Sequence, residues 1–132
     1  MEASEFFGDV VYAYSRKQAC EDGVLVDVTA TAREAGIVLP TVTTRAVWDD
    51  WVAWPTDAPA VQDVAGRLWD VLYVLSCRLR AAAQAGIKTD RVDFAVNVRG
   101  RDGRTRTAQL YALVGPGDAG EPVLTVMEQG ES

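Results

Sequence analysis

The sequence contains no histidine and only two cysteines, Cys20 and Cys77, among its 132 residues. Without histidine the chain lacks the commonest general base and metal ligand, and it cannot form Ser-His or Cys-His nucleophile pairs. The two cysteines lie far apart in segments expected to be helical, so we interpret them as buried free thiols in a reducing cytoplasm. No C-x-x-C, H-E-x-x-H or D-x-D-x-D-G motif occurs, so we expect no metal and no cofactor.

Long hydrophobic runs are also missing, because no apolar run reaches 18 residues. The first residues, MEASEFFGDVV, are acidic and lack the basic start of a secretory signal. We therefore expect a cytoplasmic protein without membrane contact. An apolar content of 48% over 132 residues predicts one domain, 1–132, with its own core. Residues 1–8 and 129–132 are expected to be loosely ordered.

Basic residues are scarce outside one segment. Residues 1–75 hold 12 acids and 5 bases, residues 76–106 hold 3 acids and 8 bases, and residues 107–132 hold 4 acids and no base. The overall charge of −6 disfavours direct nucleic-acid binding, which depends on neutralising phosphates. It suits a protein whose partner presents a basic surface.

The longest regular pattern predicts a helix over residues 61–85. Apolar residues recur there at spacings of three and four, on one face of a helix: Val61, Ala65, Leu68, Leu72, Leu75 and Leu79. Thr56 or Asp57 is the expected N-cap, and Gly86 is the expected left-handed residue after the last turn. Asp63 and Asp70 share a face with Arg67 between them, which indicates a helix-surface ion pair.

Shorter elements are predicted before this helix. Ser15 is the expected cap of a helix over 16–22, and Thr29 or Thr31 begins another short helix that ends at Gly36. Thr44 is the expected cap of a helix over 45–54. The short strands predicted in this half lie at 9–14, 24–28 and 37–43.

After Gly86 the hydrophobic period changes from about four to two. Strands are predicted at 91–99, 105–114 and 123–127, joined by an Asp-Gly hairpin at 100–103 and a Gly- and Pro-rich turn at 115–122. The predicted fold class is α+β: a three-stranded antiparallel C-terminal sheet packed against one long helix, with short N-terminal strands and helices.

Arginines gather at the predicted hairpin, and they are Arg99, Arg101, Arg104 and Arg106. Four guanidinium groups on one turn suit the recognition of carboxylates or phosphates. The alternatives are an ordinary solvated hairpin, contact with an acidic protein patch, and contact with nucleic acid. No aromatic residue is interleaved with the arginines, which weakens the case for single-strand binding.

Tryptophan and aspartate supply the other candidates for partner binding. Trp48 and Trp51 have the spacing of core residues, whereas Trp54 stands beside Pro55 at a helix end and could anchor an interface. Asp49 and Asp50 diverge by about 100° on an α-helix, so they are not a facing acid pair. We expect them on an acidic surface that a partner could contact.

Six segments stand in a recognisable order and spacing: YSRKQACEDGVLVDV (14–28), AREAGI (32–37), PTVTTRAVW (40–48), AGRLWDVL (65–72), RGRDGRTR (99–106) and GPGDAGEPVLTVM (115–127). The chain thereby resembles a family of small uncharacterised proteins carried on bacterial plasmids, integrative elements and phages. The resemblance implies no catalytic residue. It implies a setting in which small acidic proteins often inhibit host defence, as anti-CRISPR and anti-restriction proteins do.

The resulting hypothesis is a non-catalytic protein that binds a host protein complex, such as one that itself binds nucleic acid, and blocks it. One alternative is a small enzyme that uses carboxylates or Cys20. A second is a nucleic-acid accessory protein that uses the hairpin 99–106. The sequence leaves the oligomeric state open.

Overall fold

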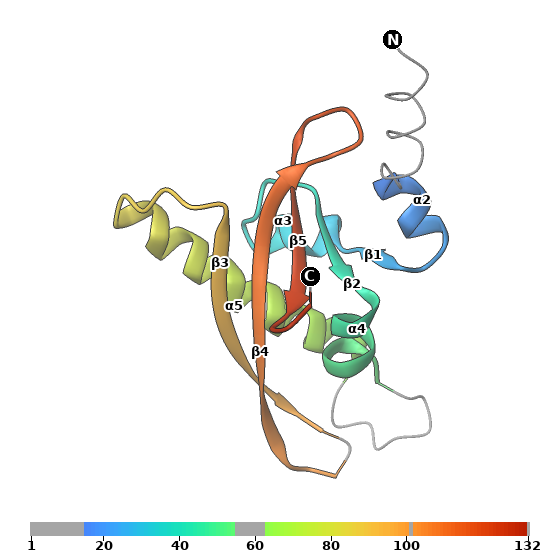
Figure 1. Cartoon of the computed structure of the whole chain (residues 1–132). Helices are drawn as coiled ribbons and strands as arrows, with labels where there is room; N and C mark the ends of the chain where they lie inside the picture. The colour runs from blue at the N-terminus through green and yellow to red at the C-terminus, as the bar shows by residue number, and fades with distance from the viewer. Residues whose placement is uncertain (1–14, 55–62, 101, 132) are drawn as a thin grey trace.

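A five-stranded mixed sheet with the strand order β1-β2-β5-β4-β3 runs through the molecule (Figure 1). The structure is a computed structural model, and it describes residues 15–54, 63–100 and 102–131. The strands are β1 (Leu25–Asp27), β2 (Thr41–Thr44), β3 (Arg91–Arg99), β4 (Thr105–Pro116) and β5 (Pro122–Glu128). The helices are α2 (Arg16–Glu21), α3 (Thr29–Glu34), α4 (Arg45–Val47), the π-helix η1 (Trp48–Val52) and α5 (Val64–Gln84).

The antiparallel meander β3-β4-β5 is confirmed, but the prediction of a separate three-stranded sheet is wrong. β2 pairs in parallel with β5, with Thr41 opposite Leu124 and Thr43 opposite Val126, and β1 pairs antiparallel with β2. The N-terminal strands therefore extend the same sheet. β2 reads only TVTT, too short to show a period, and its neighbour lies some eighty residues away in the chain.

Helix α5 covers one face of the sheet, as expected (Figure 1). Leu68, Val71, Leu72 and Leu75 are buried, and they pack in one core with side chains of β3, β4 and β5: Phe94, Val96, Val98, Ala108, Leu110, Ala112, Leu124 and Val126. Burying apolar side chains of this size stabilises the fold by about 1.5–3 kcal/mol each. α3 packs beside α5 and contributes Ala32 to the same core.

The ends of α5 differ in part from the prediction. The helix begins at Val64, and the side chain of Asp63 caps it by accepting a hydrogen bond from the Gly66 backbone at 2.6 Å. The expected caps Thr56 and Asp57, and the stripe residue Val61, lie outside the described residues. Ala65 is exposed, which corrects its place on the buried stripe. Gly86, with φ of +69°, follows the last turn as predicted.

Two predicted caps are confirmed in the N-terminal half. The Ser15 side chain accepts a hydrogen bond from the Gln18 backbone at the start of α2, and the Thr44 side chain accepts one from Val47 at the start of α4. α3 begins at Thr29, whose backbone N–H and hydroxyl both donate to the Asp27 carboxylate. The strand predicted at 9–14 lies outside the described residues.

The segment predicted as an α-helix over 45–54 changes to a π-helix after one turn. Residues Trp48–Val52 form η1, and the Ala53 backbone N–H donates to the Trp48 carbonyl, five residues back, at 2.7 Å. A π-turn inserts one residue relative to an α-helix, so it turns the following side chains to new directions.

The end of the chain is tied to the sheet, although the sequence predicts a loose segment from 129. The Gln129 side chain donates to the Asp93 carboxylate and the Leu110 carbonyl, and the Tyr111 hydroxyl donates to the Glu131 carbonyl. The Arg91 guanidinium lies 3.9 Å from the centre of the Tyr111 ring, a cation–π contact on the same side. Among the described residues, no helix combines the length and apolar character needed to cross a bilayer.

Candidate functional site

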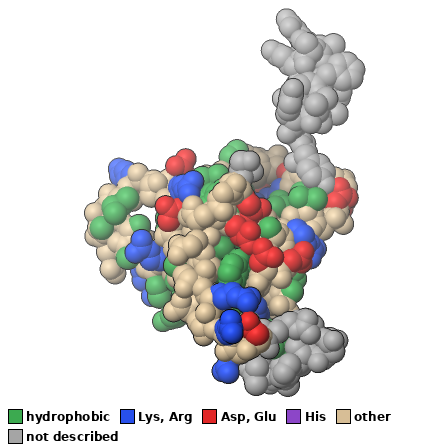
Figure 2. Space-filling view, turned by 60° about the horizontal axis from the view of Figure 1, so that its bottom comes forward, with side chains coloured by type: hydrophobic (Ala, Val, Ile, Leu, Met, Phe, Trp, Pro, Cys, Tyr) green, Lys and Arg blue, Asp and Glu red, His purple; other side chains and the backbone are tan. Residues whose placement is uncertain are grey.

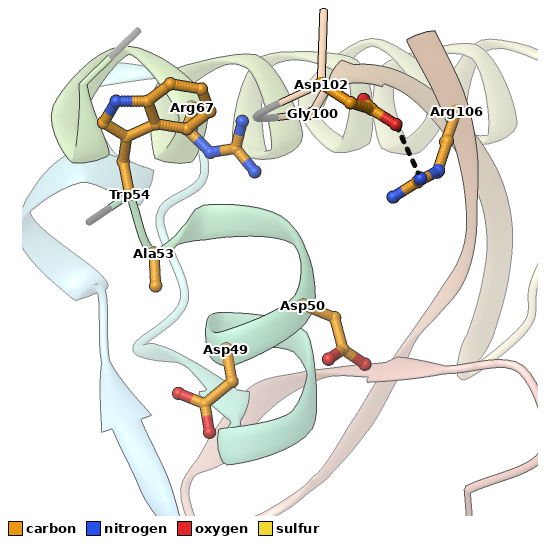
Figure 3. Close-up of a pocket in the computed structure, with 8 residues that line it drawn as sticks. All are labelled: Asp49, Asp50, Ala53, Trp54, Arg67, Gly100, Asp102 and Arg106. Carbon is orange, nitrogen blue, oxygen red and sulfur yellow. Dashed lines mark hydrogen bonds and ion pairs between the residues drawn. The ribbon is translucent and has the colours of Figure 1, made fainter. Parts of the chain in front are cut away.

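A cavity of about 530 Å³ lies between η1, the first turn of α5 and the β3–β4 hairpin (Figure 3). Eight residues line it: Asp49, Asp50, Ala53, Trp54, Arg67, Gly100, Asp102 and Arg106. Four of the residues predicted to bind a partner, Asp49, Asp50, Trp54 and Arg106, therefore meet at one place. We call this hollow the hairpin cavity.

Arg67 joins the three walls of the hairpin cavity. Only 6% of its surface is exposed. Its Nε donates to the carbonyl of Val52, the last residue of η1, at 3.1 Å. One terminal nitrogen donates to the carbonyl of Arg99, the last residue of β3, at 2.6 Å. These bonds replace the predicted ion pair of Arg67 with Asp63 and Asp70, and burial lowers the pKa of the guanidinium.

Trp54 contacts the guanidinium group of Arg67. The Arg67 guanidinium carbon lies 5.0 Å from the centre of the Trp54 ring, within the range of a cation–π interaction. Figure 3 shows the indole beside the guanidinium at the edge of the cavity. Trp54 is half-buried, so it supplies apolar surface to the cavity without being enclosed by it.

The basic wall comes from the hairpin, and of its described arginines, Arg99, Arg104 and Arg106, only Arg106 lines the cavity. The Arg106 guanidinium pairs with the Asp102 carboxylate at 3.0 Å, and Asp102 also accepts the Arg104 backbone N–H at 3.0 Å. Arg99 borders a smaller neighbouring hollow of about 230 Å³, and Arg104 is exposed. Arg101 lies outside the described residues. Figure 2 shows Lys and Arg side chains gathered at this end of the molecule.

The opposite wall is acidic and carries two carboxylates with different partners. Asp49 forms an ion pair with Arg45 at 3.6 Å, four residues back, where both groups are exposed. Asp50 lies close enough to the Glu128 carboxyl of β5 to raise its pKa. The expected divergence of the two aspartates is therefore observed, and Figure 3 shows their carboxylates pointing apart.

Glu128 is the most strongly perturbed carboxyl group beside this wall. Burial is the largest cause, and with the neighbouring Asp50 it raises the pKa of Glu128 from 4.5 to about 7. The Trp51 indole N–H donates to Glu128 at 2.8 Å and opposes part of this rise. A carboxyl with this pKa exchanges a proton near neutral pH.

The two cysteines do not match the expectation of buried thiols. Cys20 is half-buried on α2, and Cys77 is exposed on α5. Burial and the nearby Asp27 raise the pKa of the Cys20 thiol, which disfavours the reactive thiolate. Within residues 15–54, 63–100 and 102–131, no group of three or more Cys, Asp or Glu side chains is placed to hold a metal ion.

A second and larger hollow, of about 750 Å³, lies between α2 and the β4–β5 end of the sheet. Its lining is largely apolar and includes Leu25, Leu113, Val123 and Met127. None of the residues predicted to bind a partner lines it.

Sequence reasoning did not single out four residues that line the hairpin cavity, Ala53, Arg67, Gly100 and Asp102, or the neighbouring Glu128. A signal for Arg67 was present, because it stands three residues after Val64 and four before Val71, on the apolar side of α5. Glu128 carries no comparable signal, since its partners come from a segment about eighty residues earlier.

Comparison with known families matches residues 3–132 to a family of unknown function, DUF6573. The chain belongs to the DUF6573 family. No curated protein and no solved structure matches the chain. The function of this DUF6573 member therefore has to be argued from its own residues.

Proposed function

We propose that this DUF6573 protein is a non-catalytic, cytoplasmic binding protein that docks on a host protein complex and blocks it. The hairpin cavity supports this proposal more than any other feature. It places a basic residue, Arg106, opposite an acidic wall, with the half-buried Trp54 beside them. Opposed charges around an aromatic side chain suit recognition of a partner surface that carries both signs of charge.

The charge distribution of the whole chain agrees with a protein partner. The net charge is −6, and the bases are concentrated in residues 76–106. Arg106 is already paired with Asp102, so the hairpin offers phosphates less free positive charge than its four arginines suggest. A partner with a basic groove and a local acidic patch would complement both parts.

The proposed class of target, a host defence complex, follows from the resemblance to proteins of plasmids, integrative elements and phages. Its target would be a CRISPR or restriction complex of the bacterial host. Blocking such a complex requires occupation of a surface and no chemical step, which is compatible with the mixed charges of the hairpin cavity.

The proposal is tested by binding and by phage survival together. Tagged protein is incubated with host lysate, and stoichiometric partners are identified by mass spectrometry. The same gene is expressed in cells with an active CRISPR or restriction system, and phage plating is counted. We expect one defence complex to be retained, with retention weakening as salt rises, and plating to be restored.

Matched charge reversals locate the contact. Asp49→Lys and Arg104→Glu change exposed residues in or beside the hairpin cavity, whereas Asp90→Lys and Arg78→Glu make the same changes elsewhere. We expect the first pair to weaken retention at least tenfold and the second pair to leave it unchanged. Equal binding by all four variants, or no partner in any defence-competent host, would exclude the proposal.

One observation favours a second candidate, a small enzyme that acts through carboxylates. Glu128 has a pKa of about 7 and lies near Asp50, which lines the cavity, and a carboxyl with this pKa can hold and release a proton at neutral pH. This candidate predicts that Glu128→Gln abolishes the biological effect while partner retention persists. The docking proposal predicts that both survive the substitution.

A further inference from the structure

Helix α5 carries two large aromatic side chains on the face turned away from the core. Trp69 and Tyr73 are 37% and 51% exposed. Their ring centres lie 5.9 Å apart at an interplanar angle of 27°, a stacked pair one helical turn apart. Cys77, one turn further on, is also exposed. The core cluster lies on the other side of the helix, so this pair contributes little to folding.

We propose that this face of α5 binds a second copy of the chain, with the two helices antiparallel and the two Tyr73 side chains at the two-fold axis. Exposed aromatic side chains are typical anchors of interfaces because they bury a large area with few rotatable bonds. In a two-fold dimer the same surface of each copy meets, so that surface must fit itself in shape and charge. The sequence of α5 therefore determines which of its residues would face each other.

Side-chain size is complementary in this arrangement. In an antiparallel pair centred on Tyr73, each residue before it faces the residue equally far after it in the copy. Trp69 then faces the small Cys77, four positions to either side. Arg80 faces Gly66, seven positions to either side, and an added Cβ at Gly66 would meet only the Asp63 side chain. Each of these two pairs thus sets a large side chain against a small residue, whereas the pair at the axis joins two Tyr73 side chains.

Charge is complementary as well. The acids associated with α5, Asp63 and Asp70, lie in its first half, and the exposed Arg80 lies in its second half on the same side as Tyr73, whereas Arg78 lies about 140° further round the helix. An antiparallel copy brings the acidic half of each helix towards Arg80 of the other, whereas a parallel copy would place like charges together. The helix has 21 residues, so its length of about 31 Å limits the contact area. We therefore expect a weak, concentration-dependent dimer.

Sedimentation velocity over a wide range of protein concentration tests the proposal. The expected result is a monomer that converts to a dimer as concentration rises. Trp69→Glu and Tyr73→Glu are expected to keep the protein monomeric at every concentration. Val38→Glu and Ile87→Glu change other exposed apolar residues, 82% and 58% exposed, and are expected to dimerise normally. Circular dichroism of each variant confirms folding.

Disulfide trapping tests the direction of the helices. At 1.5 Å per residue, the two Cys77 residues of the antiparallel pair would lie about 12 Å apart along the helix, beyond the roughly 7 Å that a disulfide spans. Tyr73→Cys, combined with Cys77→Ser, should give a covalent dimer under mild oxidation, and the unchanged chain should not. Ready Cys77–Cys77 linkage in the unchanged chain, or a monomer at all concentrations, would overturn the proposal. Loss of the host partner in monomeric Trp69→Glu protein would instead assign this face to that partner.

Discussion

Replacing Arg67 by methionine removes a buried cation that holds η1, α5 and β3 together. Methionine keeps most of the apolar stem of arginine and loses the guanidinium. The substitution therefore leaves the Val52 and Arg99 carbonyls without their donors, and it removes the cation–π contact with Trp54.

The expected loss follows from these three contacts. A hydrogen bond from a charged donor contributes about 1.5–3 kcal/mol, and a cation–π contact contributes about 0.5–2 kcal/mol. Two effects reduce the total. Methionine has no charge to desolvate, and the Arg99 carbonyl is only part-buried, so water can reach it. We expect the free energy of unfolding to fall by about 2–4 kcal/mol.

Equilibrium unfolding in urea measures this change, with circular dichroism following the helix and tryptophan fluorescence following the environment of Trp54. Arg78→Met is the matched control, because Arg78 is an exposed arginine of the same helix. The control should lie within about 0.5 kcal/mol of the unchanged protein. If Arg67→Met unfolds at the same midpoint as Arg78→Met, the three contacts do not hold the cavity walls together.

Two further substitutions test other features. The raised pKa of Glu128 favours its protonated form in the folded state, so the stability of the unchanged protein should fall as pH rises from about 4.5 through about 7. Because solvent reaches this group, the fall should be only about 1 kcal/mol, and a Glu128→Gln variant that keeps the same slope in urea titrations across this range would refute the assignment. Thr43 has a buried hydroxyl that lacks a hydrogen-bond partner within the described part of the chain. Thr43→Val should therefore raise the urea midpoint, with a gain of about 1 kcal/mol, and a lower midpoint would show that the hydroxyl is satisfied.

The elements predicted well from the sequence are those whose signal is local. β3 alternates along its length between exposed residues such as Asp93 and buried ones such as Phe94, and the structure reproduces that alternation. Caps at Ser15 and Thr44 follow from side chains that bond to the backbone three residues away. The candidate residues Asp49, Asp50, Trp54 and Arg106 line one cavity, although nothing in the sequence placed them together.

What could not be predicted depends on contacts between distant residues. β2 joins the sheet only because Thr41 and Thr43 lie beside β5. In the π-turn at Trp48–Val52, the Trp51 side chain donates a hydrogen bond to Glu128 of β5. The helix propensities of neighbouring residues cannot predict such a long-range contact. Arg67 looked like a surface residue because two aspartates flank it on its own helix, yet its partners are carbonyls of η1 and β3.

The parallel pairing of β2 with β5 has a consequence for the order of synthesis. β5 is the last of the five described strands to be synthesised, and it is the described neighbour of β2 on the side away from β1. Strands β1 and β2 must therefore wait, with one edge of β2 unpaired, until residues 122–128 have left the ribosome. A chain that stops before Pro122 would lack the strand that pairs with β2, so this part of a nascent chain should stay sensitive to proteases until β5 has emerged.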